Sequence, residues 1–279
     1  MPVRELDVGD RVGAYRLMAP IASGGMGKVF RAEHEVLRRP HAVKVLHARV
    51  MERDPRAAER LHAEARAASR VRHPSVVEVA DAGQLADGRP FVVMELVEGP
   101  SLCEHAAGMA MPAQHAVAIA RQLAGALTTA HACGVIHADV SPANVIVDLD
   151  LRAKLIDFGL ARVDGEPCFG HGELVHGTPA YMAPERFRGT APDQASDQYA
   201  LGIIIHEMLS GSPPFSGETV RELYFAHLRG TLPELDGVPR GLNEIVSRCL
   251  AKLPGDRFPG MAAVADALEA LERALEAAP

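Results

Sequence analysis

The residues of this chain that could do chemistry gather between positions 135 and 185. Asp139 precedes Asn144 by five positions, and Asp157 follows a short apolar segment. Transfer of a phosphoryl group to a hydroxyl requires a carboxylate that orients the hydroxyl and accepts its proton. It also requires oxygen ligands for Mg²⁺, a hard cation that prefers carboxylate and amide oxygens. These residue types suit metal-assisted phosphoryl transfer, although Asp139 and Asn144 taken alone could simply stabilise turns.

Two features nearer the N-terminus suit the same chemistry. The sequence Gly-Gly-Met-Gly at residues 24–27 lies between two segments with strand character. Glycines there allow backbone N–H groups to approach a phosphate without a Cβ in the way, but a plain hairpin turn explains the segment equally well. Lys44 stands in an apolar run between Val43 and Val45, where a lone lysine would ordinarily face solvent. Each signal is weak by itself.

The elements that position these residues follow from periodicity, glycines and prolines. We expect strands at residues 15–18, 29–32, 42–46, 76–79 and 91–94, with one helix that begins at Asp54-Pro55 and ends at about Val71. Farther along we expect helices at 112–132, 195–210, 219–228, 241–251 and 260–276, and a strand at 145–147. The predicted organisation is an N-terminal extension at 1–14, a small lobe at 15–97, a larger lobe at 98–271 and a tail at 272–279.

The candidate residues belong to a series that occurs in one fixed order. Its members are Lys44, Glu64, His137-Ala138-Asp139, Asn144, Asp157-Phe158-Gly159 and Ala183-Pro184-Glu185. The series resembles the protein kinase signature set from about Tyr15 to about Leu271. Residues 24–27 and 177–185 look most similar to the bacterial eukaryotic-like Ser/Thr protein kinases. The resemblance implies an α+β fold of two lobes, a small and mostly antiparallel β lobe with one helix and a larger, mainly α-helical lobe.

The resemblance also implies catalytic roles. Asp139 would be the catalytic base, and Asn144 and Asp157 would hold Mg²⁺. Lys44 would assist Asp139, together with Ser141 and with Thr178, which would hydrogen-bond the catalytic carboxylate. The implied reaction is transfer of the γ-phosphoryl group of ATP to Ser or Thr hydroxyls of protein substrates.

An ATP site follows from the same resemblance. Lys44 would bind the α- and β-phosphates and pair with Glu64, because Glu59 lies one to two turns too early on the same helix. Val29 and Ala42 would sandwich the adenine ring. The full set implied for ATP is Ile21, Ala22, Ser23, Gly24, Gly25, Met26, Gly27, Val29, Ala42, Lys44, Glu64, Met94, Glu95 and Val97.

Two further matches imply structural roles. Glu185 would pair with Arg257 near the end of the chain, and Asp197 would brace the catalytic loop. Three residues depart from the family pattern: Ala22 replaces the first glycine of the turn, Ala138 replaces an arginine, and Ser141 replaces a lysine. Since that lysine helps to neutralise the transferring phosphoryl group, we expect slower chemistry.

Two alternative functions stay open. The three departures are compatible with a pseudokinase that acts as an ATP-binding scaffold. A small-molecule kinase of similar fold is the second alternative, and the Gly-Thr-Pro…Ala-Pro-Glu segment at 177–185 disfavours it because such kinases generally lack it.

The segment between Asp157 and Gly177 contains no Ser, Thr or Tyr. In many kinases the arginine replaced here by Ala138 binds a phosphate on this loop. The double absence predicts an enzyme that needs no activation-loop phosphorylation. Cys168, His171 and His176 in the same loop could form a metal or redox switch, but their spacing favours plain solvated side chains.

Composition narrows the class of protein. The 279 residues carry a net charge of -7, which disfavours nucleic acid or an anionic membrane surface as the main partner. The four cysteines have no metal-ligand or redox spacing, and no apolar run reaches the roughly 18 residues of a membrane span. We therefore expect a cytoplasmic protein with no membrane segment in this chain. Neither the substrate nor the oligomeric state can be predicted.

Overall fold

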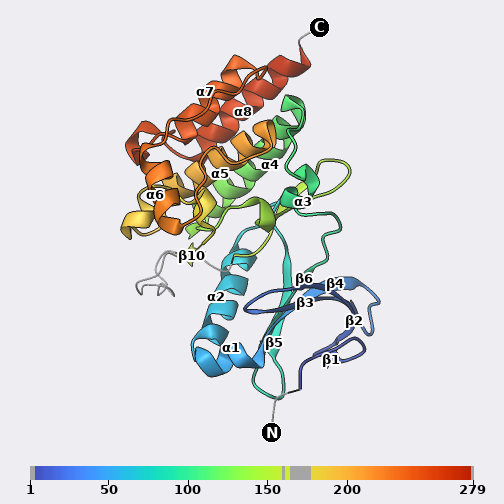
Figure 1. Cartoon of the computed structure of the whole chain (residues 1–279). Coiled ribbons are helices and arrows are strands. Elements are labelled where there is room, and N and C mark those ends of the chain that lie inside the picture. The colour runs from blue at the N-terminus through green and yellow to red at the C-terminus, as the bar shows by residue number, and fades with distance from the viewer. Residues whose placement is uncertain (1–3, 159–160, 164–176, 278–279) are drawn as a thin grey trace. The chain divides into compact units, whose positions relative to one another are not determined.

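The computed structural model describes residues 4–158, 161–163 and 177–277. The backbone divides into two compact units, and each is treated by itself. The first comprises Met1–Arg70 and Val77–Glu98, and the second comprises Val71–Val76 and Gly99–Pro279 (Figure 1). Residues 71–76, which were predicted within the small lobe, group with the second unit.

The first unit is built on an antiparallel sheet of six strands. Along the chain these are β1 (Arg11–Val12), β2 (Tyr15–Ser23), β3 (Gly27–His34), β4 (Pro40–Leu46), β5 (Val79–Gln84) and β6 (Pro90–Glu95). Their order across the sheet is β1-β2-β3-β4-β6-β5. The fourth predicted strand, 76–79, is misplaced: β5 begins at Val79, and Val76 instead forms a parallel bridge with Leu155 in the second unit.

Alternation along β4 places Lys44. Val43 and Val45 belong to the apolar core on one face of the sheet, together with Leu17, Phe30 and other residues of β1–β3 and β6. Successive side chains of a strand point to opposite faces, so Lys44 and Leu46 lie on the other face. Leu46 packs there in a second cluster with Leu61 of the helix that follows.

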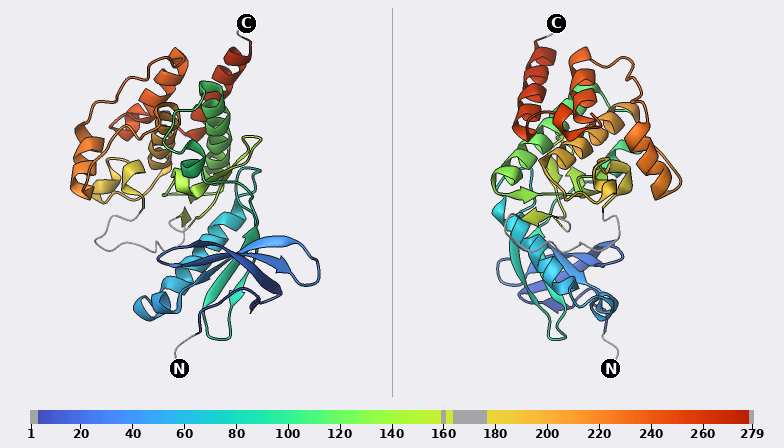
Figure 2. Two further views of the ribbon diagram at one scale, coloured as in Figure 1. Left: turned by 45° about the vertical axis from the view of Figure 1, so that its right-hand side comes forward. Right: turned by 90° about the vertical axis from the view of Figure 1, so that its left-hand side faces the viewer.

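Two helices accompany this sheet instead of the one predicted. The first, α1 (Ala48–Arg53), was not expected, and α2 (Ala57–Arg70) begins later than the predicted start at Asp54. Asp54 ends α1, and its carboxylate accepts a hydrogen bond of 2.9 Å from the N–H of Arg56. Leu61 and Ala65 of α2 pack with Leu46 and Val92 of the sheet, and α2 runs along the sheet in every view (Figures 1 and 2).

The second unit is mainly helical. Its helices are α3 (Leu102–Ala106), α4 (Ala113–Ala132), α5 (Gln194–Ser210), α6 (Val220–Arg229), α7 (Arg240–Cys249) and α8 (Met261–Glu276). All five predicted helices of this region are confirmed to within two residues at each end. The short α3 was missed, although Ser101 and Glu104 form a capping box at its start, a signal that is visible in sequence.

Helix α5 is the core of the second unit. Residues 196–206 are all buried, because α4, α7 and α8 pack around this helix. Gly202 allows the close approach of α7, since a Cβ there would lie 2.8 Å from the Cβ of Cys249. The N-terminus of α5 is fixed by a capping box between Asp193 and Ser196.

Short strands and a single helical turn carry the catalytic candidates. The pairs are β7 (Val135–Ile136) with β10 (Arg162–Val163), and β8 (Val145–Val147) with β9 (Ala153–Leu155). The 3₁₀ turn η1 (Pro142–Asn144) leads into β8. Along the chain, residues 137–144 therefore connect β7 of the first strand pair to β8 of the second.

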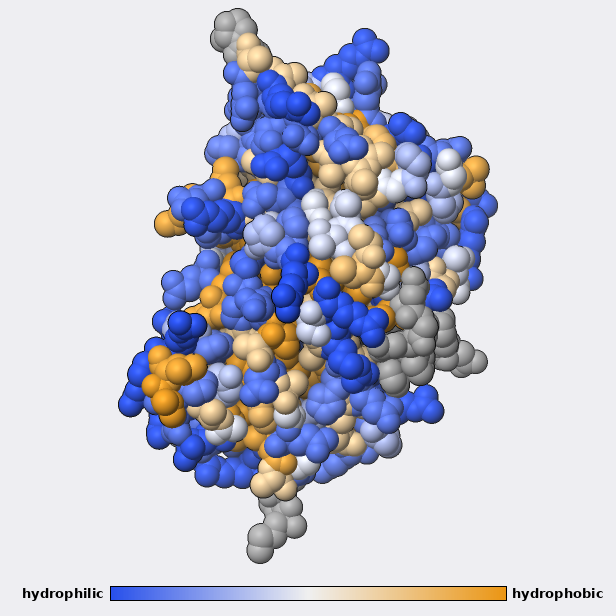
Figure 3. Space-filling view, turned by 180° about the vertical axis from the view of Figure 1, so that it is seen from behind, coloured by the Kyte–Doolittle hydropathy of each residue, from blue (hydrophilic) through white to orange (hydrophobic). Residues whose placement is uncertain are grey.

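In the described part of the chain, no helix combines the length and the apolar character that a membrane crossing requires. The space-filling view shows one face on which hydrophilic side chains predominate and apolar ones are scattered among them (Figure 3).

Candidate active site

In the first unit, Lys44 and Glu64 form an ion pair. Lys44 Nζ lies 2.7 Å from Glu64 Oε1, and the two side chains are only 14% and 12% exposed. Glu59, the alternative partner considered from sequence, is exposed in the first turn of α2. The two side chains meet because β4 turns Lys44 toward the face of the sheet on which α2 packs.

The glycine-rich turn connects β2 and β3. The N–H of Gly24 donates to the carbonyl of Gly27 over 3.0 Å and closes the turn. Gly27 has to be a glycine, because a Cβ there would lie 2.3 Å from the carbonyl oxygen of Val45. The N–H groups of Gly25 and Met26 donate to no protein acceptor within the described ranges. A turn with exposed amides and no side chain in the way suits a phosphate.

The other residues implied for ATP lie along the same sheet. Val29 is paired with Lys44, and Ala42 with Met94, in the strand register. Ala22 is paired with Val29, while Ile21 and Met26 are about half exposed. The remaining three are Ser23, which is paired with Lys28; Glu95, whose backbone N–H donates to the carbonyl of Glu78; and Val97, which is half-buried.

In the second unit, three predicted residues meet at the carboxylate of Asp139. Thr178 donates to Asp139 Oδ1 twice, from its backbone N–H at 2.9 Å and from its hydroxyl at 3.0 Å. The amide nitrogen of Asn144 donates to Asp139 Oδ2 at 3.2 Å and to the Asp139 carbonyl at 2.9 Å. Since the nitrogen of the Asn144 amide is engaged in this way, its oxygen is the group able to ligate a cation.

Asp197 braces the backbone that precedes Asp139. It is 1% exposed, and its carboxylate accepts hydrogen bonds of 2.9 Å from the N–H groups of His137 and Ala138. His131 Nε2 lies 2.9 Å from the same carboxylate. Ala138 has a φ of +67°, a left-handed conformation that is costly for alanine, so the two bonds to Asp197 help to maintain it.

Phe158, the residue after Asp157, is buried against His137. Asp157 itself has a φ of +60°. The ring of Phe158 lies 4.7 Å from the ring of His137, and burial lowers the pKa of His137. Gly159, the last residue of this motif, lies outside the described residues, as do Cys168, His171, His176 and most of the loop that lacks Ser, Thr and Tyr.

Ser141, which stands where the family has a lysine, is buried. It is 1% exposed, and its Oγ has no hydrogen-bond partner within the described ranges.

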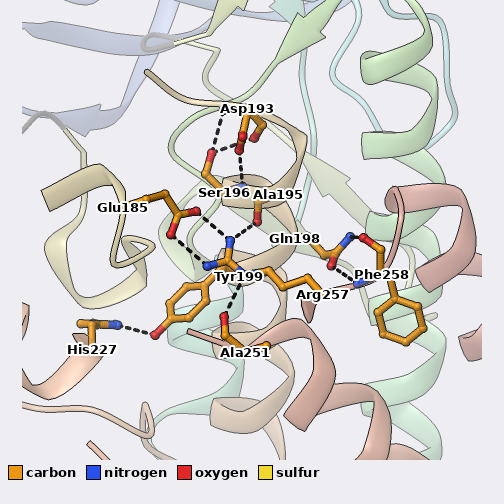
Figure 4. A network of polar contacts seen from close by, with 10 residues as sticks. All are labelled: Glu185, Asp193, Ala195, Ser196, Gln198, Tyr199, His227, Ala251, Arg257 and Phe258. Carbon is orange, nitrogen blue, oxygen red and sulfur yellow. Dashed lines mark hydrogen bonds and ion pairs between the residues drawn. The ribbon is translucent and has the colours of Figure 1, made fainter. Parts of the chain in front are cut away.

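The predicted pair Glu185–Arg257 is present, with the Arg257 side chain fully buried and the Glu185 side chain 11% exposed (Figure 4). The guanidinium of Arg257 makes two bonds to the carboxylate of Glu185, at 2.7 and 2.9 Å, and donates to the carbonyls of Ala195 and Ala251. It also lies 4.9 Å from the centre of the Tyr199 ring. The pair joins the end of the 177–185 segment to α5 and to the loop before α8.

One pair near the site was missed by sequence reasoning. The hydroxyl of Tyr181 donates to Glu207 Oε2 at 2.7 Å, and burial raises the pKa of both groups. Tyr181 lines a small cavity beside Asp139 whose wall also includes Ala138, Arg186 and Asp197. No local signal marks Glu207, because it lies 26 positions from Tyr181, near the C-terminal end of α5.

Comparison with known proteins identifies the family. The protein kinase domain family matches residues 15–268. The chain belongs to the protein kinase family. Membership confirms the predicted kinase fold, with a β-sheet lobe and a larger helical lobe.

The protein kinases most informative for this chain are mycobacterial. The serine/threonine-protein kinase PknH of Mycobacterium tuberculosis is 39% identical over 258 residues, which is 90% of this chain and 41% of PknH. PknL of the same species is 37% identical over 267 residues, 94% of this chain and 66% of PknL. PknD is 37% identical over 258 residues, 90% of this chain and 38% of PknD. The chain thus spans less than half the length of PknH and PknD.

Proposed function

We propose that this kinase domain transfers the γ-phosphoryl group of ATP to Ser or Thr hydroxyls of protein substrates. The arrangement of Asp139 carries the proposal. Thr178 and Asn144 donate to different oxygens of its carboxylate and hold it in one orientation. A carboxylate that is fixed and hydrogen-bonded in this way can orient a hydroxyl and accept its proton. The three mycobacterial relatives all carry the name serine/threonine-protein kinase.

The donor set fits ATP and Mg²⁺. Asn144 and Asp157 supply the oxygen ligands that Mg²⁺ prefers, and the metal would neutralise charge on the phosphates. In the first unit, the free amides of the glycine-rich turn suit phosphate oxygens, and Lys44, oriented by Glu64, would bind the α- and β-phosphates. Val29 and Ala42 would contact the adenine. Because the proposed reaction consumes ATP, we place the kinase domain in the cytoplasm, where ATP is abundant.

We further propose that the domain is active without phosphorylation of its activation loop. Ala138 has no side chain that could bind a phosphate, and no Ser, Thr or Tyr lies between Asp157 and Gly177. Asp197 already holds the backbone of Ala138. Phosphatase-treated protein should therefore phosphorylate substrate from the first minutes. A lag that preincubation with ATP removes, together with a phosphosite mapped within residues 157–185, would contradict this.

A pseudokinase scaffold is the alternative, and the replacement of the family's lysine by the buried, uncharged Ser141 favours it most directly. The two functions separate in one assay, transfer of label from γ-labelled ATP to a generic protein substrate. Asp139→Asn should abolish transfer and retain nucleotide binding. The matched control is Asp150→Asn, the same chemical change at a side chain that is 70% exposed. Nucleotide binding without transfer by the unmodified protein would establish the scaffold instead.

A further inference from the structure

His47 makes contacts that the roles above do not use. It follows β4 directly, three residues after Lys44, and only 6% of its surface is exposed. Its backbone N–H donates to the carbonyl of Met26 at 3.0 Å. Its ring nitrogen Nε2 lies 3.1 Å from the carbonyl oxygen of Gly24. His47 thus contacts both ends of the glycine-rich turn, Met26 through its backbone N–H and Gly24 through its buried side chain.

The turn has little else to hold it. A Cβ added at Gly24 or Gly25 would meet nothing within 4 Å, so these residues are not packed against other atoms. Met26 is 57% exposed and supplies no apolar contact with the core. Glycines have more conformational freedom than any other residue. The contacts with His47, with the closing bond from Gly24 to Gly27, therefore account for most of the restraint on the turn.

The contacts also determine which backbone groups remain available. The carbonyls of Gly24, Met26 and Gly27 all accept hydrogen bonds from within the first unit. Carbonyl oxygens repel a phosphate, whereas N–H groups attract it. By engaging two of these carbonyls, His47 favours a turn in which the N–H groups of Gly25 and Met26 are left for an anion.

The hydrogen on His47 follows from its neighbours. The oxygen of Gly24 can only accept, so Nε2 carries the hydrogen. The other ring nitrogen, Nδ1, lies 3.4 Å from Glu5 Oε2, a long contact to a side chain that is half exposed. We therefore assign the main effect to the bond with Gly24 and a minor one to Glu5.

We propose that His47 is a positioning residue that holds the glycine-rich turn in its phosphate-binding arrangement. The proposal rests on the proposed function, since it assumes that the turn binds the phosphates of ATP. It assigns His47 no contact with the nucleotide itself. Its effect should appear in the affinity for phosphates and be absent from the affinity for the nucleoside.

Two substitutions at His47 distinguish the effect of the hydrogen bond to Gly24 from the effect of the size of the ring. His47→Phe keeps a ring of similar size and removes the donor, and His47→Gln keeps an N–H donor. Calorimetry with the full chain measures the dissociation constants of ADP and of adenosine. Loss of one hydrogen bond should weaken ADP binding about five- to tenfold in His47→Phe and leave adenosine binding unchanged. His47→Gln should recover most of the loss, and Glu5→Gln should change ADP binding by less than about twofold.

The matched control is His41→Phe, the same change at the far end of β4, where the ring packs against Tyr15. It should leave both dissociation constants unchanged. If His47→Phe is less stable, hydrogen exchange tests the inference separately. The hydrogen-bonded amides of Gly24 and of residue 47 should exchange faster, while those of β5 and β6 should not.

Three results would overturn the inference. Equal ADP affinity in His47→Phe and the unmodified protein would show that the turn does not need His47. Equal losses for ADP and adenosine would mean that the substitution damages the whole unit. If the unmodified protein bound no ADP, the proposed function would fail as well, and this measurement therefore comes first.

Discussion

Thr178 donates two hydrogen bonds to a single oxygen of Asp139, one from its backbone and one from its side chain. The backbone bond survives any substitution except proline, so the side chain can be tested separately. This makes residue 178 a means of weakening the orientation of the catalytic carboxylate without removing the carboxylate.

Thr178→Val should lower kcat about tenfold, because one hydrogen bond to a charged acceptor is lost while the shape of the side chain is kept. Thr178→Ser retains the hydroxyl and should stay within about twofold of the unmodified protein. Steady-state kinetics with varied ATP should show little change in KM for ATP. An unchanged kcat in Thr178→Val would mean that Asn144 and the backbone bond suffice to orient Asp139.

Lys44→Met should abolish phosphoryl transfer and leave the fold intact. Lys44 lies on the face of β4 opposite Val43 and Val45, so the apolar core on their face is untouched. The assay is transfer from labelled ATP, with circular dichroism as the test of folding. Glu59→Gln, on the exposed side of α2, is the control and should keep full activity, whereas Glu64→Gln should lose activity because the carboxylate that orients Lys44 is neutralised. Near-normal turnover in Lys44→Met would refute the role given to the lysine.

Arg257→Met should destabilise the protein by about 3–5 kcal/mol, since it leaves the carboxylate of Glu185 enclosed without its cation. Urea unfolding measures the change in the free energy of unfolding. Arg240→Met is the matched control: it breaks an ion pair with Glu244 in which both side chains are largely exposed, and it should have no measurable effect. Similar results for the two variants would show that the Glu185–Arg257 pair contributes no more than a surface pair.

Lowering the pH from 6.5 to 4 should reduce the free energy of unfolding, because His227 binds a proton in the unfolded chain but not in the folded protein. Burial, with the ammonium of Lys252 nearby, lowers the pKa of His227 from 6.5 to about 4. In the unfolded chain this histidine binds a proton below pH 6.5, while in the folded protein it stays neutral until about pH 4. The unfolded state therefore binds more protons in this window, and stability falls as the pH is lowered from 6.5 to 4.

His227→Phe tests that prediction. The loss of stability in the unmodified protein should approach about 3 kcal/mol across the window from His227 alone. His73, His137 and His206 also have pKa values lowered by burial, so they contribute in the same direction. The difference in pH dependence between the unmodified protein and His227→Phe isolates the one histidine. Parallel curves of the free energy of unfolding against pH would contradict the prediction.

The sequence alone predicted the elements that depend on local patterns. The helices α4 and α5–α8 begin or end beside a proline, a glycine or a capping side chain, so their bounds were predicted to within two residues. The motif order likewise pointed to the kinase family and to Glu64 as the partner of Lys44. Periodicity failed for α1 and for the start of β5, where short elements give too few residues for a pattern to emerge.

Only the tertiary structure decided which distant residues meet. Nothing in the sequence joins His47 to Gly24, 23 positions away, or Tyr181 to Glu207. The first contact depends on the register of β3 against β4, and the second on how α5 packs beneath the 177–185 segment. Such contacts are set by the packing of whole elements, whereas the local pattern of residues determines only the elements themselves.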